Sequence, residues 1–475
     1  MKKASTLVVT FDGLRRDRAT AELMPNLAAF MKSGVNFINS RSIFPSETRV
    51  AVTSTVTGAP PRDHGLVANQ YIHDAVVQGR TFQTADYKDL MAADAIGQLI
   101  DRKALGERLS AAGKTMAVVS TASPGATWMM NHKARTIGHP VFSVHGEPIS
   151  TLDLHRAALE KFGPVPADAT PNTARLDYAC SVLTDIVYPE IDPDLCIFWM
   201  SDPDSTSHAF GVNGAETEAS QRGADAAFGR IVELWRSGNG PENLVVMSDH
   251  GQITGVQQVH VAEHLPQYAD RLSIGSFSGL YLENQTPETL AELVKYLSEQ
   301  PWCGLIFAET ADGQVIDGAL PWSAVSHGHK RGATVGFTLR ATPPSTESAN
   351  RNDQCLFAAY IQPGGGMHGG LNRGELSTVL AAAGPAFVAD MVSEVPCWLP
   401  DIAPTLLTVL GLPTDGTSGR VLTEALVGDG RVPAVEQRTL TAKIGGHEQY
   451  LRQWLVEGTA ITDCGWTGGT GTWRL

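Results

Sequence analysis

The sequence predicts an α/β fold with a mostly parallel central sheet and helices on both faces. Four apolar runs, at residues 6–11, 116–120, 195–200 and 243–247, have the length and continuous hydrophobicity of strands buried on both sides. Helical patterns lie between them, at residues 20–33, 48–57, 98–112, 170–188 and 215–237. This alternation of strands and helices implies a parallel sheet with helices on both of its faces.

The alternation stops after residue 254. Residues 255–353 include a helical pattern near 286–299 and a polar stretch near 342–354, and we expect them to form a subdomain inserted at the edge of the active site. The core would then be discontinuous, comprising residues 1–254 and 354–412.

Residues 413–475 are rich in Gly and Thr and are predicted to form a C-terminal extension. A helical pattern at 445–456 and an end that carries Trp466 and Trp473 suggest a tail that packs on the body or on a second subunit. A homodimer is therefore one outcome that the sequence leaves open.

Composition limits the class of protein. The chain has 475 residues, 43% of them hydrophobic and 18% charged, and a net charge of −14, which argues against binding of nucleic-acid polymers. No stretch is long enough to span a bilayer. The basic start at Met1 runs directly into the first predicted strand, and six cysteines are scattered without CxxC spacing, so we expect a cytoplasmic protein, with a removed leader peptide as the alternative.

Metal-ligand residue types follow, or lie close to, apolar runs. Three runs are the predicted strands that start at residues 6, 195 and 243, and the fourth is Leu356–Ile361, which we also expect to be a buried strand of the sheet. The ligand types are Asp12, Asp204, His208, Asp249, His250 and His368. Because residues beyond the carboxyl ends of parallel strands line one crevice, these side chains should converge. Three Asp and three His suit a pair of divalent ions, with zinc expected and manganese the alternative.

The spacing strengthens this hypothesis. Asp204 and His208 are one helical turn apart, so both can reach one ion. Asp249 and His250 leave a predicted strand where a bend can direct both toward one ion or toward two adjacent ions. Each residue alone would be an ordinary cap or turn residue.

These motifs resemble the alkaline phosphatase superfamily, and within it the type I phosphodiesterase/nucleotide pyrophosphatase family and its phosphonoacetate hydrolase relatives. The matching segments are Phe11-Asp12-Gly13, Pro203-Asp204 with His208, Asp249-His250-Gly251, Met367-His368-Gly369 and 400–407. The resemblance extends from residue 8 to about residue 412. It implies that residues 255–353 cap the substrate pocket.

The resemblance also implies a nucleophile. Family members carry a Thr or Ser nine residues before a Thr-Gly pair and sixteen before a His-Gly pair. Thr57-Gly58 and His64-Gly65 both count back to Thr48. Metal coordination would activate its hydroxyl, and the following helix would present N–H groups to the phosphate. The alternatives are that Thr48 is only a helix N-cap, or that Ser46 is the nucleophile although it misses the spacing.

Two further residues bear on substrate binding. Asn69 matches the family's side-chain amide that holds a phosphoryl oxygen. Arg49 stands where nucleotide pyrophosphatases usually place an aromatic residue that stacks on the base. A guanidinium pairs more naturally with a second anionic group of the substrate, unless Arg49 only points to solvent or forms a structural ion pair.

The sequence thus predicts a two-metal phosphohydrolase that cleaves phosphodiester, pyrophosphate or related bonds of small molecules through a phosphothreonine. By the resemblance, one ion is held by Asp204, His208 and His368, and the other by Asp12, Thr48, Asp249 and His250. The alternatives are a phosphonate hydrolase of the phosphonoacetate hydrolase type, a metal-dependent phosphomutase and a ligand-binding pseudoenzyme.

Overall fold

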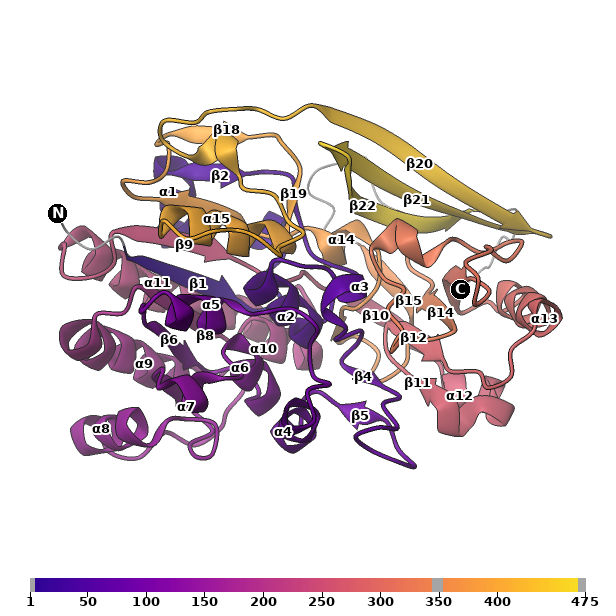
Figure 1. Ribbon diagram of the computed structural model, residues 1–475, viewed down its shortest axis with the longest axis horizontal. Coiled ribbons are helices and arrows are strands. Elements are labelled where there is room, and N and C mark those ends of the chain that lie inside the picture. Colours follow the sequence, from indigo (N-terminus) through magenta and orange to yellow (C-terminus); the bar gives the residue numbers. More distant parts are fainter. Residues whose placement is uncertain (1–4, 344–352, 469–475) are drawn as a thin grey trace.

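The computed structural model describes residues 5–343 and 353–468 and confirms the α/β prediction. An eight-stranded sheet lies between two layers of helices (Figure 1). Its strands, in spatial order, are β18 (Met391–Ser393), β2 (Val35–Phe37), β17 (Leu380–Ala383), β9 (Asn243–Met247), β1 (Thr6–Phe11), β8 (Leu195–Met200), β6 (Met116–Ser120) and β7 (Val141–Ser143). All run in one direction except β17, which is antiparallel to both of its neighbours.

The four predicted strands of the sheet form at the predicted residues and lie side by side, in the order β9-β1-β8-β6. Successive side chains of a strand point to opposite faces. In β1, Val8 joins one hydrophobic core while Leu7 and Val9 join the core on the other face. Both faces are covered, which explains why the runs are apolar throughout.

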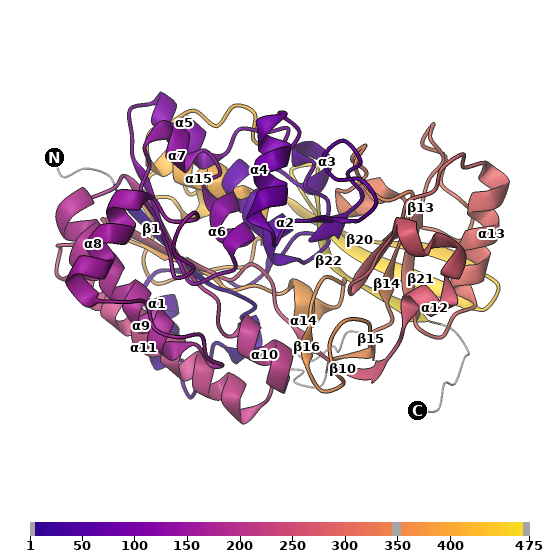
Figure 2. The same ribbon diagram turned by 90° about the horizontal axis from the view of Figure 1, so that it is seen from below.

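Helices cover the two faces separately (Figure 2). One face packs against α1 (Pro25–Ser33), α8 (Leu152–Phe162), α9 (Thr173–Val182) and α11 (Ala215–Arg236). The other packs against α2 (Thr48–Thr57), α4 (Tyr87–Ala95), α5 (Leu105–Ala111), α6 (Pro124–Met130), α7 (Ala134–Ile137) and α15 (Ile402–Val409). The five predicted helices are present, although α1 and α5 are shorter than their patterns and α9 continues into a wider π-helix, Leu183–Ile191.

The expectation that the run Leu356–Ile361 joins the main sheet is wrong. This segment forms β15 (Gln354–Ala358) in a separate three-stranded sheet with β10 (Ile253–Gln258) and β16 (Gly366–Met367). Only two of the five residues of β15 are buried, so it is not a strand covered on both faces. β10 begins just after the Asp249-His250 pair. Because β15 pairs with β10, β15 lies in the smaller sheet and not in the larger one.

The inserted segment carries a third sheet, in the order β11-β12-β14-β13. Its strands are β11 (Leu272–Ser273), β12 (Phe277–Leu280), β14 (Val335–Leu339) and β13 (Cys303–Ala308). Helix α13 (Pro287–Ser298), predicted at 286–299, packs on β13 and shares a hydrophobic core with it. The short α12 (Val261–His264) lies in the same region (Figure 1). The division of the chain into a core at 1–254 and 354–412, a cap and an extension stays a prediction.

The prediction of a helix at 445–456 is wrong. The C-terminal segment forms an antiparallel sheet of β20 (Val435–Ile444), β21 (His447–Val456) and β22 (Thr459–Gly468). Residues of β21 mostly alternate between buried and half-buried, the period of a strand, because successive side chains point to opposite faces and one face is covered. β22 contacts β13 of the insert and α14 (Arg373–Leu376) of the core, so this sheet packs on the body of the same chain (Figure 1). Trp466 lies in β22, and Trp473 lies outside the described residues.

The remaining α-helices and strands of the described residues are short. They are β3 (Ser40–Arg41), β4 (Gln70–Tyr71), β5 (Phe82–Gln83), β19 (Cys397–Trp398), α3 (Pro61–His64) and α10 (Asp204–Phe210). Within the described ranges, no helix has both the length and the apolar character needed to cross a membrane.

Candidate metal centre and nucleophile

The structure brings the six predicted Asp and His ligands together at the carboxyl-terminal edge of the main sheet. Asp12 directly follows β1, Asp249 and His250 come just after β9, and Asp204 begins α10 after β8. His368 reaches the same place from β16 of the smaller sheet.

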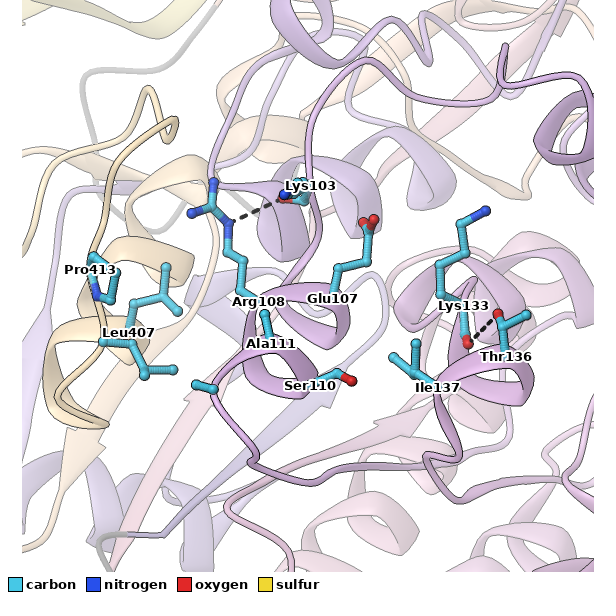
Figure 3. Close-up of a pocket in the computed structure, with 12 residues that line it drawn as sticks. Lys103, Glu107, Arg108, Ser110, Ala111, Lys133, Thr136, Ile137, Leu407 and Pro413 are labelled. Atoms are coloured by element: carbon cyan, nitrogen blue, oxygen red, sulfur yellow. Dashed lines mark hydrogen bonds between the residues drawn. The ribbon is translucent and has the colours of Figure 1, made fainter.

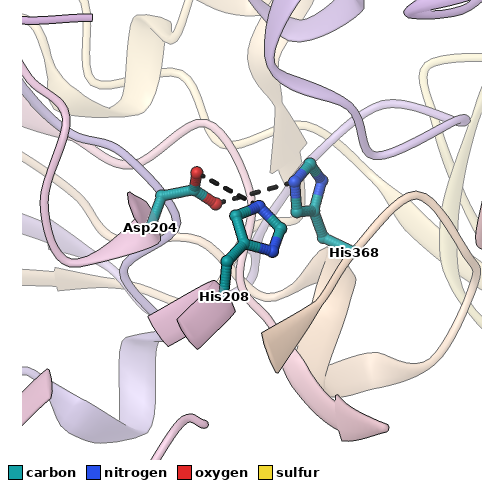
Figure 4. Close-up of side chains that lie close together, drawn as sticks. All are labelled: Asp204, His208 and His368. Carbon is teal, nitrogen blue, oxygen red and sulfur yellow. Dashed lines mark ion pairs between the residues drawn. The ribbon is translucent and has the colours of Figure 1, made fainter. Parts of the chain in front are cut away.

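Asp204, His208 and His368 form the first group (Figure 4). His208 Nε2 lies 3.4 Å from Asp204 Oδ2, and His368 Nε2 lies 3.6 Å from Asp204 Oδ1. Asp204 and His208 are one turn apart in α10, so they extend to the same side of that helix. One oxygen and two imidazole nitrogens at this spacing are suited to a single divalent ion.

Asp12, Asp249, His250 and Thr48 form the second group. His250 Nε2 lies 3.6 Å from Asp12 Oδ1, 3.2 Å from Asp249 Oδ2 and 3.2 Å from Thr48 Oγ1. Ligand atoms of Asp12, Asp204 and His250 lie within 4.8 Å of one another. Asp204 therefore stands between the two groups, which form one continuous cluster.

Backbone carbonyls orient the three imidazoles. The Nδ1 atoms of His208, His250 and His368 lie 2.8, 3.1 and 2.8 Å from the carbonyl oxygens of Gly366, Gly251 and Ser46, respectively. A carbonyl oxygen only accepts, so each Nδ1 carries the proton and donates it. Each Nε2 is thereby left with its lone pair, and it faces the carboxylates, as in histidines that bind metals.

The carboxylates of the cluster fit bound cations. Asp12 and Asp249 are 4% and 0% exposed, and each has one oxygen, Oδ1 and Oδ2 respectively, without a hydrogen-bond partner among residues 5–343 and 353–468. Their other oxygens accept from Trp199 Nε1 at 2.8 Å and from Gly13 N at 3.0 Å. Burial, and then the charges of Asp249 and Asp204, raise the pKa of Asp12 well above its usual range. Cations among these oxygens would remove this repulsion and satisfy the unpaired atoms.

Gly13 allows β1 and α10 to approach. Its φ is +67°, and a Cβ atom there would lie 2.8 Å from Asp204 Cβ. A larger residue would push Asp204 away from the cluster, and the Gly13 N–H would no longer meet Asp249. The close approach of Asp204 thus explains why a glycine stands at the end of the Phe-Asp-Gly segment.

Thr48 and Ser46 occupy different environments. Thr48 is the first residue of α2, and Glu47 occupies the N-cap position, so the interpretation of Thr48 as an N-cap is wrong. Ser46 Oγ donates to the carbonyl of Gly370 at 3.0 Å and accepts from the N–H of Gly369 at 3.0 Å. Ser46 therefore holds the loop after His368, whereas the Thr48 hydroxyl faces the second ligand group.

Asn69 and Arg49 lie next to Thr48. Asn69 Oδ1 accepts from the backbone N–H of Arg49 at 3.3 Å, so the side-chain amino group of Asn69 is its remaining donor. The Arg49 side chain is half-buried, and its Nε donates to Thr84 Oγ1 at 3.3 Å. The Arg49 charge lowers the pKa of Asp12 against the larger raising effect of burial, so the guanidinium acts electrostatically on the cluster.

Sequence reasoning missed three residues at this site. Glu47 is buried and accepts from the backbone N–H of Asn69, and burial raises its pKa to about 7. The amide of Gln252 donates to Asp204 Oδ1, and the hydroxyl of Tyr360 donates to the carbonyl of His368 at 3.3 Å. The available signals were an acid directly before Thr48 and an aromatic residue near the end of an apolar run.

The structure also contains an open groove of about 780 Å³, whose lining residues differ from the residues of the ligand cluster (Figure 3). It is lined by residues in and next to α5, α7 and the end of α15, including Lys103, Arg108, Lys133, Leu407 and Pro413. None of its lining residues is one of the predicted ligands, so we assign the chemistry to the Asp and His cluster.

Residues 6–314 match the model of the family described as type I phosphodiesterase / nucleotide pyrophosphatase. The chain belongs to this family. Structural similarity agrees: murine ectonucleotide pyrophosphatase/phosphodiesterase 5, solved as an inactive variant in complex with AMP, superposes with a TM-score of 0.62. The similarity covers 86% of this chain and 96% of that chain at 16% identity, a level that shows the shared fold alone.

Curated family relatives match over shorter segments. Bis(5'-adenosyl)-triphosphatase enpp4 of Xenopus laevis is 41% identical over 69 residues, which are 14% of this chain and 15% of that protein. Venom phosphodiesterase of Macrovipera lebetinus is 24% identical over 285 residues, 58% of this chain and 29% of that protein. The matches thus span less than a third of the length of these relatives.

Proposed function

We propose that the protein is a metal-dependent phosphohydrolase that cleaves phosphodiester or pyrophosphate bonds of small molecules through a phosphothreonine at Thr48. The observation that carries this proposal is the place of the Thr48 hydroxyl, at the start of α2 and 3.2 Å from His250 Nε2 within the ligand cluster. The names of the relatives, a phosphodiesterase and a dinucleoside triphosphatase, support the class of bond.

The donor set supports two divalent ions, zinc or alternatively manganese. One ion would be held by Asp204, His208 and His368, and the other by Asp12, Thr48, Asp249 and His250. When bound, such ions lower the pKa of a coordinated hydroxyl and neutralise charge that develops on the phosphoryl group.

The residues of the chain would supply the rest of the reaction. Thr48 Oγ bonds to phosphorus while the bond to the leaving-group oxygen breaks, and the hydroxyl proton passes to solvent. The N–H groups at the start of α2 and the amino group of Asn69 donate to the equatorial oxygens. Water then attacks phosphorus, the bond to Thr48 Oγ breaks, and Thr48 regains a proton as the product leaves.

Arg49 favours substrates with a second anionic group. Its guanidinium lies close enough to the cluster to affect Asp12, in a position directly after the nucleophile. A charged group on the substrate would gain a charge-assisted hydrogen bond there. The same observation favours, as a second candidate, hydrolysis of a phosphonate that carries a carboxylate, as in phosphonoacetate hydrolase.

Turnover of methyl 4-nitrophenyl phosphate with added zinc tests the proposal. Thr48→Ala should lower turnover by orders of magnitude, Thr48→Ser should keep much of it, and Ser46→Ala should lose far less than Thr48→Ala. Chelation should abolish the wild-type activity, and zinc should restore it. An inactive Ser46→Ala protein beside an active Thr48→Ala protein would overturn the choice of nucleophile, and a wild-type protein that releases no 4-nitrophenol from this ester would contradict the hydrolase proposal.

A further inference from the structure

Tyr360 lies beside the first ligand group with its ring accessible. The residue follows β15 and is 46% exposed. Its hydroxyl donates to the carbonyl of His368 at 3.3 Å, and its ring centroid lies 6.3 Å from that of His208, at an interplanar angle of 66°. The side chain is therefore held at its tip, against the two histidines of Figure 4, while much of its ring remains open.

A second aromatic residue at the cluster differs in accessibility. Trp199 donates from Nε1 to Asp12 Oδ2 at 2.8 Å, but it is 2% exposed and belongs to a hydrophobic core. Its ring is therefore closed to a substrate. Tyr360 offers an open aromatic face at the same cluster.

Tyr360 and Thr48 contact different ligand groups of the cluster. Thr48 is in the His250 group, 3.2 Å from His250 Nε2, whereas Tyr360 contacts the group of His208 and His368. In an in-line displacement the leaving group departs on the side of phosphorus opposite to the nucleophile. A leaving group opposite to Thr48 would then depart toward the ligand group that Tyr360 contacts.

On the basis of the proposed function, we propose that Tyr360 is a specificity-determining residue whose ring packs against a planar aromatic leaving group. Aromatic rings gain from stacked or edge-to-face contact beyond the area that they bury. Arg49, adjacent to the nucleophile, would then act on the retained part of the substrate, and Tyr360 on the departing part. Preference for the leaving group would depend on ring area as well as on acidity.

Two substrates separate these properties: the methyl phosphodiesters of 4-nitrophenol and of 4-methylumbelliferone, which have similar acidity and different ring area. The measured quantity is the ratio of their kcat/KM values. Tyr360→Leu should lower the preference for the larger ring about two- to tenfold, and Tyr360→Phe should preserve it because the ring remains. Metal content, measured by atomic emission, should stay at the wild-type level in both variants.

An unchanged ratio in Tyr360→Leu, or equal losses on both esters, would overturn the inference and identify Tyr360 as structural. If Tyr360→Leu loses metal, Tyr360→Trp provides the test. Its larger ring should raise the kcat/KM ratio in favour of the larger leaving group. A ratio that stays constant or falls would overturn the inference. A wild-type protein that hydrolyses neither ester refutes the phosphohydrolase proposal itself, and the inference fails with it. An active wild type with an unchanged ratio refutes only the role of Tyr360.

Discussion

Removing the carboxylate of Asp463 should destabilise the protein strongly. Asp463 lies in β22 and is 1% exposed, and one of its oxygens is 2.7 Å from Nη2 of Arg41, whose side chain is 6% exposed. The other oxygen meets Arg452 Nε at 2.6 Å and Arg373 Nη2 at 3.1 Å. This single carboxylate therefore joins the C-terminal sheet to β3 and α14 of the core.

The burial of Arg41 determines how much stability the protein should lose. Asp463→Asn keeps the size of the side chain but leaves a buried guanidinium without its counter-charge, a change that costs about 3–5 kcal/mol in buried pairs. The side chains of Arg452 and Arg373 are 25% and 30% exposed. Solvent screens their ion pairs with Asp463, so losing these pairs adds little to the loss of stability. We expect the free energy of unfolding to fall by about 3 kcal/mol or more.

Urea unfolding followed by tryptophan fluorescence measures this change. The matched control is Lys443→Gln, which breaks the pair between Lys443 and Glu448 in the same sheet, where the side chains are 65% and 30% exposed. Its unfolding midpoint should stay close to that of the wild type, because solvent screens an exposed pair. If Asp463→Asn unfolds at the same urea concentration as this control, the buried pair contributes no stability and the reasoning is refuted.

Two further predictions concern substrate choice and pH. Arg49→Ala should reduce kcat/KM about ten- to more than a hundredfold for substrates with a second anionic group, since a charge-assisted hydrogen bond contributes about 1.5–3 kcal/mol. It should spare neutral aryl diesters. Equal losses on both kinds of substrate would mean that Arg49 is structural or serves the transferred phosphoryl group. Burial raises the pKa of Glu375 from 4.5 to about 7, so its contribution to stability is present below pH 4.5 and lost as the pH rises through about 7. In urea unfolding, the wild type should therefore lose stability relative to Glu375→Gln over this interval, and a constant difference would contradict the assignment.

The sequence predicted the central strands well because their environment leaves a simple pattern. β1, β6, β8 and β9 are covered on both faces, so almost every position in them is apolar. The two wrong predictions of strands and helices lie where this condition fails. β15 is half-exposed, and β21 carries Glu, Gln, Arg and Leu, which favour helices in isolation, but pairing with β20 and β22 overrides that preference.

The same contrast separates the predicted metal ligands from the residues that contact their surroundings. Asp12, Asp204 and Asp249 follow strands whose order in the sheet makes their ends adjacent, so order and spacing along the chain were enough to predict that they meet. Glu47 and Tyr360 contact a backbone N–H 22 residues away and a carbonyl eight residues away, respectively, and no periodicity marks such contacts. Ligand order along the chain therefore indicates the class of reaction, while side chains such as Glu47 and Tyr360 are placed at the cluster only by the folded structure.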